Sequence, residues 1–130
     1  MGTVLTITDE SFETEVLGSE KPFLLDFWAS WCGPCLREMP NMKDLHRTYK
    51  EKGLTIIGIS LDEDTDSWNQ AINEYKLNIW PQILDMESND ESISDVYNVQ
   101  SIPHYILIDK QGKIVARWQL EQINLDDFLK

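Results

Sequence analysis

The two cysteines of the chain, Cys32 and Cys35, are the residues whose type and spacing best support chemistry. They lie between an apolar run, 23–29, that predicts a buried strand and a run, 36–52, that predicts a helix. A helix N-terminus carries unpaired N–H groups and a partial positive charge, which favour a thiolate over a thiol. The second sulfur lies one helical turn from the first, close enough to form a small disulfide ring. The spacing therefore predicts a redox-active pair that cycles between dithiol and disulfide.

Three other roles are open to such a pair of cysteines. A buried structural pair would not require Gly33-Pro34 between the sulfurs, nor a place at a helix start. A structural zinc site needs four ligands, but the sequence has no second Cys-x-x-Cys, and its two histidines, His46 and His104, are far apart, so no metal is expected. A peroxide-reducing enzyme often uses a distant resolving cysteine, and no cysteine lies outside the pair. The reversible dithiol–disulfide pair is the favoured interpretation.

Asp26 is the one charged residue in the apolar run before the cysteines. Burial disfavours the ionised form of a carboxyl group, so its pKa should be raised. It stands six residues before Cys32, in the strand that leads to the pair. We therefore predict that Asp26 is buried and moves a proton for the cysteines. The alternative is a structural aspartate at a strand edge with a polar partner.

Length and charge limit the other possibilities. A chain of 130 residues predicts a single domain, 1–130, with its own core. The net charge of −12 argues against binding of nucleic acid or of an anionic membrane by charge, and no stretch is long enough to span a bilayer. We expect a monomer without a cofactor. No basic-then-apolar leader is present, so we expect a cytoplasmic protein, or an extracytoplasmic (periplasmic) one if a leader was removed.

The remaining patterns predict alternating strands and helices. The acidic run 62–66 is expected to be an acidic loop that caps the next helix, because a calcium loop needs a Gly and a Glu that are missing here. Parallel crossovers followed by a hairpin at 109–113 predict a mixed central sheet with helices on both faces. The expected strands are 4–6, 23–29, 54–61, 80–86, 105–109 and 114–118, and the expected helices are 9–17, 36–52 with a kink at Pro40, 67–76, 92–97 and 125–129.

The chain resembles the thioredoxin superfamily along its whole length. Residues 5–35 are similar to thioredoxin itself, above all in the run Asp26-Phe27-Trp28-Ala29-Ser30-Trp31-Cys32-Gly33-Pro34-Cys35. From Leu36 on the chain is similar to the TlpA/ResA-type thiol-disulfide oxidoreductases, which are related to the AhpC/TSA-like group. The residues that carry this second resemblance are Arg37-Glu38-Met39-Pro40, the run 57–62, the inserted αβ unit around Trp68 and Trp80, Ser101-Ile102-Pro103, and the run 107–112.

The resemblance implies an α/β thioredoxin fold with an inserted αβ unit before a cis-proline, Pro103. It implies a thiol-disulfide oxidoreductase that reduces protein disulfides and is itself recharged by an upstream thiol reductant. Cys32 would be the solvent-facing nucleophile and Cys35 the more buried thiol that resolves the mixed disulfide. Trp28 and Trp31 would flank the site. The substrate-binding residues that it implies are Trp31, Gly33, Pro34, Ile102 and Pro103.

The chain also departs from this pattern. Gly58 stands where thioredoxins carry a lysine near the buried aspartate, and His104 replaces a small polar residue after the cis-proline. Gly33-Pro34 adds no positive charge to hold a thiolate, which favours a reductant over a strong oxidant. The alternative function is a redox-inert or metal-binding interaction module on the same scaffold.

Overall fold

The computed structural model describes residues 21–85, 92–119 and 125. The predicted strand 4–6 and helix 9–17, the loop 87–91 and nearly all of the predicted helix 125–129 lie outside these residues. Among the described residues, no helix is long and apolar enough to cross a membrane. The strands are β1 (Phe23–Trp28), β2 (Thr55–Ser60), β3 (Gln82–Leu84), β4 (His104–Ile108) and β5 (Ile114–Trp118). The helices are α2 (Gly33–Arg37), α3 (Met39–Tyr49), α4 (Thr65–Tyr75), α5 (Ile93–Val96) and a short 3₁₀ helix, η2 (Lys50–Lys52).

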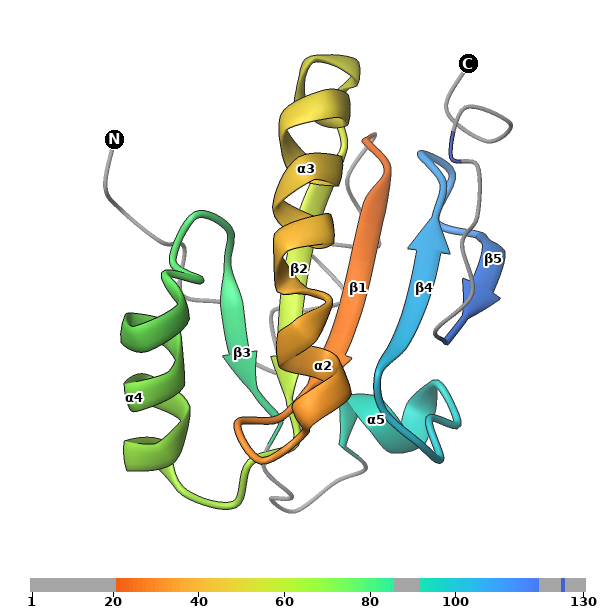
Figure 1. Ribbon diagram of the computed structural model, residues 1–130. Helices are drawn as coiled ribbons and strands as arrows, with labels where there is room; N and C mark the ends of the chain where they lie inside the picture. Colours follow the sequence, from red (N-terminus) through yellow and green to blue (C-terminus); the bar gives the residue numbers. More distant parts are fainter. Residues whose placement is uncertain (1–20, 86–91, 120–124, 126–130) are drawn as a thin grey trace.

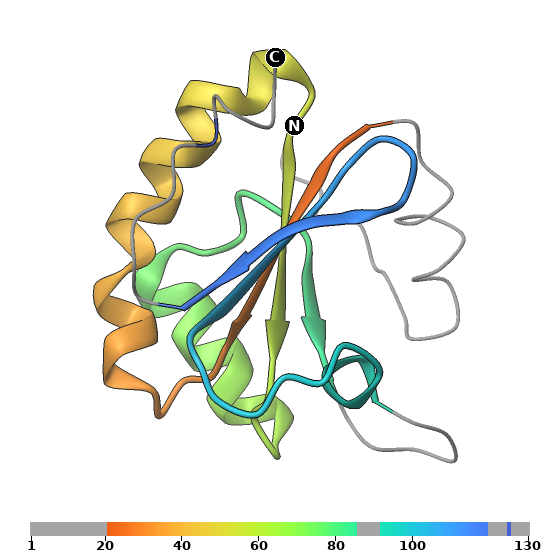
Figure 2. The same ribbon diagram turned by 90° about the vertical axis from the view of Figure 1, so that its right-hand side faces the viewer.

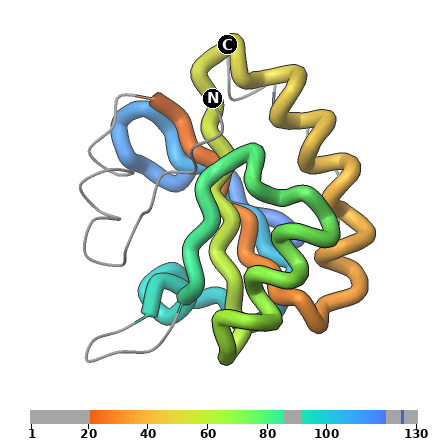
Figure 3. The backbone as a smooth tube through the Cα atoms, turned by 90° about the vertical axis from the view of Figure 1, so that its left-hand side faces the viewer, coloured from red at the N-terminus to blue at the C-terminus, as the bar shows by residue number. Residues whose placement is uncertain are grey.

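The five strands form one mixed sheet in the order β3-β2-β1-β4-β5 (Figure 1). The strand β1 runs parallel to β2 and antiparallel to β4, while β2 pairs with β3 in parallel and β4 with β5 in antiparallel. The helices α3 and α4 cover one face, and α5 lies on the other (Figures 2 and 3). This confirms the predicted thioredoxin-like fold, with α4 and β3 as the inserted αβ unit.

The central strand β1 is buried on both faces, which explains its unbroken apolar run. Because side chains alternate along a strand, Leu24 and Trp28 join the core beneath α3. The intervening Phe23, Leu25 and Phe27 join a second core on the opposite face. By the same alternation Asp26 lies on the α3 face, together with the cysteines.

The predicted single helix from residue 36 is instead two helices, and the first begins at Gly33. They are separated at Glu38, whose backbone has φ −85° and ψ −9°. Pro40 is the second residue of α3, and its ring cannot tolerate a helical carbonyl four residues earlier. The break therefore comes before the proline rather than as a kink at it.

Two other boundaries differ from the prediction. The helix α4 begins at Thr65 rather than residue 67, because the side chain of Asp64 accepts a hydrogen bond from the Ser67 N–H at 2.8 Å and caps the helix. The strand β3 covers three residues rather than 80–86, because within the described part of the chain it is the outermost strand and its only ladder is with Gly58–Ser60 of β2.

One row of residues crosses all five strands at the level of Asp26. The Gln82 side chain at its end accepts a hydrogen bond from the buried Trp28 Nε1 at 3.1 Å and donates one to the Leu77 carbonyl at 2.9 Å. A Cβ at Gly58 would lie only 2.1 Å from Gln82 Oε1. The space where thioredoxins place a lysine is therefore filled by the Gln82 amide. The row is Trp118, Tyr105, Asp26, Gly58 and Gln82.

We expect Gly58→Ala to lower the free energy of unfolding by about 1–3 kcal/mol, because the added methyl group displaces the Gln82 amide from its two partners. Denaturant titration measures this loss. In a Gln82→Ala background the obstruction is gone, so the same substitution should cost much less. An equal cost in both backgrounds would show that the amide is not what excludes a side chain at position 58.

Candidate active site

Cys32 and Cys35 are joined by a disulfide, with their Cα atoms 5.3 Å apart, at the turn between β1 and α2. Cys32 caps α2: its carbonyl accepts a hydrogen bond from the Leu36 N–H at 3.1 Å. Its Sγ accepts one from the Cys35 N–H at 3.2 Å. The same N–H would stabilise a negative charge on this sulfur once the pair is reduced.

The disulfide is less exposed than the sequence predicts. Cys32 keeps 5% of its surface exposed and Cys35 keeps 1%, so the predicted order holds but Cys32 is not solvent-facing in this oxidised form. Both cysteines belong to the core cluster beneath α3. The exposed member of the motif is Trp31, at 67%, whereas Trp28 is fully buried.

Asp26 lies in the middle of the sheet and is 1% exposed. Its Oδ2 atom has no hydrogen-bond partner. Burial, and secondarily the negative charge of Glu38, raise the pKa of Asp26 to about 7. The predicted burial and raised pKa are confirmed, and the alternative of a strand-edge aspartate with a polar partner is wrong.

The sequence pattern does not mark Glu38 or Tyr105 as site residues, but the structure places both near Asp26. Tyr105 pairs with Asp26 across β4 and β1 and stacks on Trp118, with ring centroids 5.5 Å apart. Burial, followed by the charges of Asp26 and Glu38, raises the pKa of the Tyr105 hydroxyl, which therefore keeps its proton at neutral pH. The available signal for Glu38 was its place three residues after Cys35, one turn further along the chain.

A residue outside the Cys-x-x-Cys motif, Arg37, places a positive charge over the cysteine turn. A Cβ at Gly33 would lie 3.2 Å from Arg37 Nη1, so the guanidinium group rests over the glycine between the two cysteines. The two residues are four apart, the spacing at which side chains on one helix face meet. Arg37 thus supplies the cation that Gly33-Pro34 lacks.

The peptide bond between Ile102 and Pro103 is cis, as predicted. His104 follows at the start of β4 and pairs with Phe27, near the end of β1. The cis-proline and the turn that carries Cys32 therefore lie at the same end of the sheet, where β1 ends and β4 begins. The role of Ile102 and Pro103 in substrate binding stays a prediction.

Residues 19–114 match the family described as thioredoxin-like. The chain belongs to the thioredoxin-like family. It is 38% identical over 112 residues to the thiol-disulfide oxidoreductase ResA of Bacillus anthracis, covering 85% of this chain and 62% of that protein. It is 40% identical over 94 residues to ResA of Oceanobacillus iheyensis, covering 72% and 47%. The chain thus spans less than two thirds of the length of these curated relatives.

Solved structures agree. The thioredoxin domain of a thiol-disulfide oxidoreductase from Bacteroides vulgatus superposes with a TM-score of 0.72 at 34% identity, over 86% of this chain and 81% of that one. A thiol-disulfide oxidoreductase from Bacteroides fragilis gives 0.70 at 34% identity, over 81% and 77%. The match to ResA spans 112 residues, which is longer than the part of the chain after Cys35. The similarity to ResA therefore extends into the segment before Leu36, which also resembles thioredoxin.

Within this thioredoxin-like domain, hydrogen bonds tie the loop before β4 to β5. Arg117 donates to His104 Nε2 from Nε at 3.3 Å and from Nη2 at 3.2 Å, and Nη2 also donates to the Tyr97 carbonyl at 2.5 Å. Gln119 Nε2 donates to Ser101 Oγ at 2.7 Å. Partial burial and then the Arg117 charge lower the pKa of His104, so the imidazole is neutral, with Nε2 as the acceptor. The cis-proline is thereby held from both sides.

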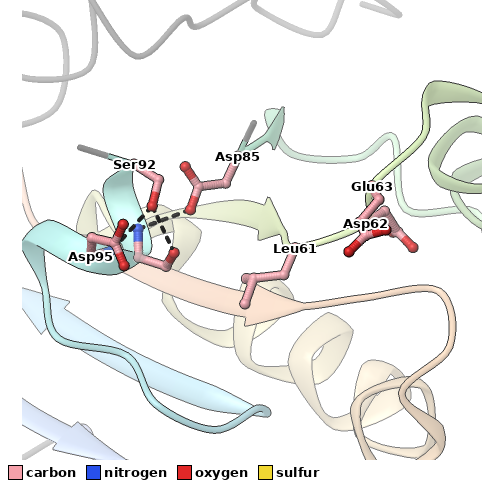
Figure 4. A pocket seen from close by; sticks show the side chains of 7 residues that line it. Leu61, Asp62, Glu63, Asp85, Ser92 and Asp95 are labelled. Atoms are coloured by element: carbon pink, nitrogen blue, oxygen red, sulfur yellow. Dashed lines mark hydrogen bonds between the residues drawn. The ribbon is translucent and has the colours of Figure 1, made fainter. Parts of the chain in front are cut away.

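The acidic residues after β2 are not all solvated. Asp62, the first residue of the predicted acidic loop, is buried and accepts hydrogen bonds from Ser30 and Ser60. Beside it a cavity of about 430 Å³ opens between the ends of β2 and β3 and the start of α5 (Figure 4). Its wall includes Asp85, whose carboxylate accepts the N–H groups of Ile93 and Ser94 at 2.8 and 2.9 Å. The carboxylates of Asp62 and Asp85 both line this cavity, and each accepts hydrogen bonds from neighbouring backbone or serine groups.

We expect Asp26→Asn to remove a pH dependence of stability. Between about pH 4, the unfolded pKa of an aspartate, and about pH 7, the folded protein holds a proton that the unfolded chain has released. The free energy of unfolding of the wild type should therefore fall as pH rises through this window, by up to about 4 kcal/mol, and stay low above it. Denaturant titrations from pH 4 to 8 should show this fall in the wild type and not in the variant, whose profile keeps only the contributions of its other titrating groups.

Asp66→Asn is the matched control, because it neutralises an exposed carboxylate in the first turn of α4 and should keep the wild-type slope. His46 and His104 contribute in the opposite direction, since their lowered pKa values make stability rise with pH, but they do so equally in all three proteins. If the wild type and Asp26→Asn have parallel profiles, Asp26 titrates in the folded protein as it does in the unfolded chain, and its pKa is not raised.

The position of Arg37 gives a separate prediction. In the reduced protein, Arg37→Gln should slow iodoacetamide alkylation of Cys32 at pH 7 by roughly two- to fivefold, because the exposed cation over Gly33, next to Cys32 in the chain, is lost. The difference should shrink in 1 M salt. Lys43→Gln removes a cation that donates instead to the Tyr75 carbonyl, and should leave the rate unchanged. Equal effects of the two variants would mean that only net charge matters.

Proposed function

We propose that the chain is a thiol-disulfide oxidoreductase that reduces disulfides of protein clients through Cys32 and Cys35. The observation that carries this proposal is the disulfide at the start of α2, with the Cys35 N–H directed at Cys32 Sγ. Relatives that are named thiol-disulfide oxidoreductases support it, both in sequence and in fold. A redox-inert module would have no need of this geometry.

The reaction begins with the reduced pair. The Cys32 thiolate attacks one sulfur of the client disulfide, forms a mixed disulfide and releases the other client sulfur as a thiolate. Cys35, having lost its proton, attacks Cys32 Sγ and releases the second client sulfur. Two electrons pass from the pair to the client, and the Cys32–Cys35 disulfide remains. An upstream thiol reductant then returns the pair to the dithiol state.

Asp26 is the proposed base for the second step. Its pKa of about 7 means that a large fraction of the carboxyl groups is ionised at neutral pH and can accept the Cys35 proton. Glu38 raises that pKa and so increases the proton affinity of Asp26. Tyr105, which stays protonated beside Asp26, does not compete for the proton.

Clients are proposed to dock across the exposed Trp31 at the sheet edge that also carries the cis-proline. Trp31 is apolar and open, so it offers contact area next to a nearly closed disulfide. The backbone of Ile102 would pair with an extended client segment, and Gly33, Pro34 and Pro103 would complete the contact. We expect the domain to act as a monomer.

Insulin reduction by dithiothreitol tests the proposal. The wild-type domain should accelerate precipitation of the insulin B chain, whereas Cys32→Ser should leave only the rate of dithiothreitol alone. Cys35→Ser should accumulate a mixed disulfide on Cys32 that thiols release, and limiting iodoacetamide should label Cys32 first in the reduced wild type. Asp66→Asn is the control for surface charge. A wild-type domain that matches dithiothreitol alone would refute a reducing role.

A further inference from the structure

The Asp62 carboxylate is buried, at 3% exposure, and holds three donors. The Ser30 N–H lies 3.0 and 3.2 Å from its two oxygens, and Ser30 Oγ lies 2.5 Å from Oδ1. On the other side Ser60 Oγ donates to Oδ2 at 2.6 Å and accepts the Asp62 N–H at 2.9 Å. A buried carboxylate is costly unless its oxygens are hydrogen-bonded, and here the donors come from the ends of two neighbouring strands.

These contacts hold the segment that delivers the nucleophile. Ser30 lies within the turn from Ala29 to Cys32, which is closed by a hydrogen bond from the Cys32 N–H to the Ala29 carbonyl at 3.1 Å. Just before it, the Leu61 N–H donates to the Trp28 carbonyl at 2.8 Å. The loop between β1 and α2 is therefore fastened to the loop between β2 and α4 at two successive places. Beyond the second one, Ser30, the chain leads directly to Trp31 and Cys32.

We propose that Asp62 is a positioning residue that, through Ser30, holds Cys32 at the start of α2 in the orientation where its sulfur receives the Cys35 N–H. The Asp62 group does not touch the sulfurs; it acts on the turn that carries them. This inference rests on the proposed function, because it concerns the reactivity of the nucleophile. It assigns that reactivity in part to a residue 30 positions away in the sequence.

The chemistry of the carboxylate makes the arrangement specific. A carboxylate accepts at both oxygens and donates at neither, which matches a site where both serines donate. An amide at the same place has one acceptor oxygen and turns an NH₂ group toward one of these donors. Asp62→Asn should therefore break one side of the clamp at nearly constant volume. If the Ser30 side is freed, the turn relaxes and the Cys35 N–H no longer lies on Cys32 Sγ.

The test is the pH profile of Cys32 alkylation in the reduced full chain, measured with iodoacetamide and read by peptide mass. Asp62→Asn and Ser30→Ala should each slow labelling at pH 7 at least threefold and move the midpoint of the profile to higher pH. Ser30→Thr keeps both the hydroxyl and the N–H and should restore wild-type behaviour. Asp66→Asn, the matched neutralisation at an exposed position, should change nothing.

A role confined to stability predicts a different result: lower melting temperatures with an unchanged alkylation profile in every folded variant. That result overturns the proposal. If Asp62→Asn does not fold, the Ser30→Ala and Ser30→Thr pair decides, because Ser30→Ala leaves the carboxylate and the backbone N–H in place. The assay uses no client, so a shifted profile together with no insulin reduction would refute the proposed function and leave the positioning role intact.

Discussion

The hydrogen-bonded pairing of β1 with β2 on one side and β4 on the other determines where Asp26, the cysteine turn and the cis-proline lie. Because β1 is parallel to β2 and antiparallel to β4, its last residues lie at the end of the sheet where β2 also ends and β4 begins. That end receives the cysteine turn from β1, the Asp62 loop from β2 and the cis-proline before β4. The cysteine turn, the Asp62 loop and the cis-proline are far apart in sequence, and the pairing of these three strands brings them to one end of the sheet.

The carboxyl group of Asp26 is buried, whereas the positively charged Arg37 is exposed. Asp26 is buried with a second carboxylate, Glu38, acting on it, and the two together also suppress ionisation of Tyr105. The guanidinium group of Arg37 lies outside, over Gly33 and near water, where its field is screened. The interior therefore favours a protonated carboxyl group, while the cation over the cysteine turn favours a thiolate.

The sequence predicted whatever depended on local pattern. The cysteine spacing, the two-sided burial of β1 and the raised pKa of Asp26 follow from neighbours along the chain, and the cis bond at Pro103 followed from family resemblance. What it missed depends on tertiary contacts. In the sequence Asp62 lies among acidic residues, and nothing there shows that the fold places it against Ser30, 32 positions earlier. The position of Arg37 depends on the direction of a side chain along the helix, and composition does not reveal it.

The Gln82 side chain of β3 fills the space above Gly58 of β2, the residue that pairs with Asp26 of β1. Returning a lysine to position 58 would first require Gln82 to be vacated, and that would leave the buried Trp28 N–H without its acceptor. No single substitution there gives Asp26 a counter-charge without this loss. The high proton affinity of Asp26 therefore depends on the Gln82 amide, which keeps a cation out of position 58. We expect positions 58 and 82 to change together in evolution.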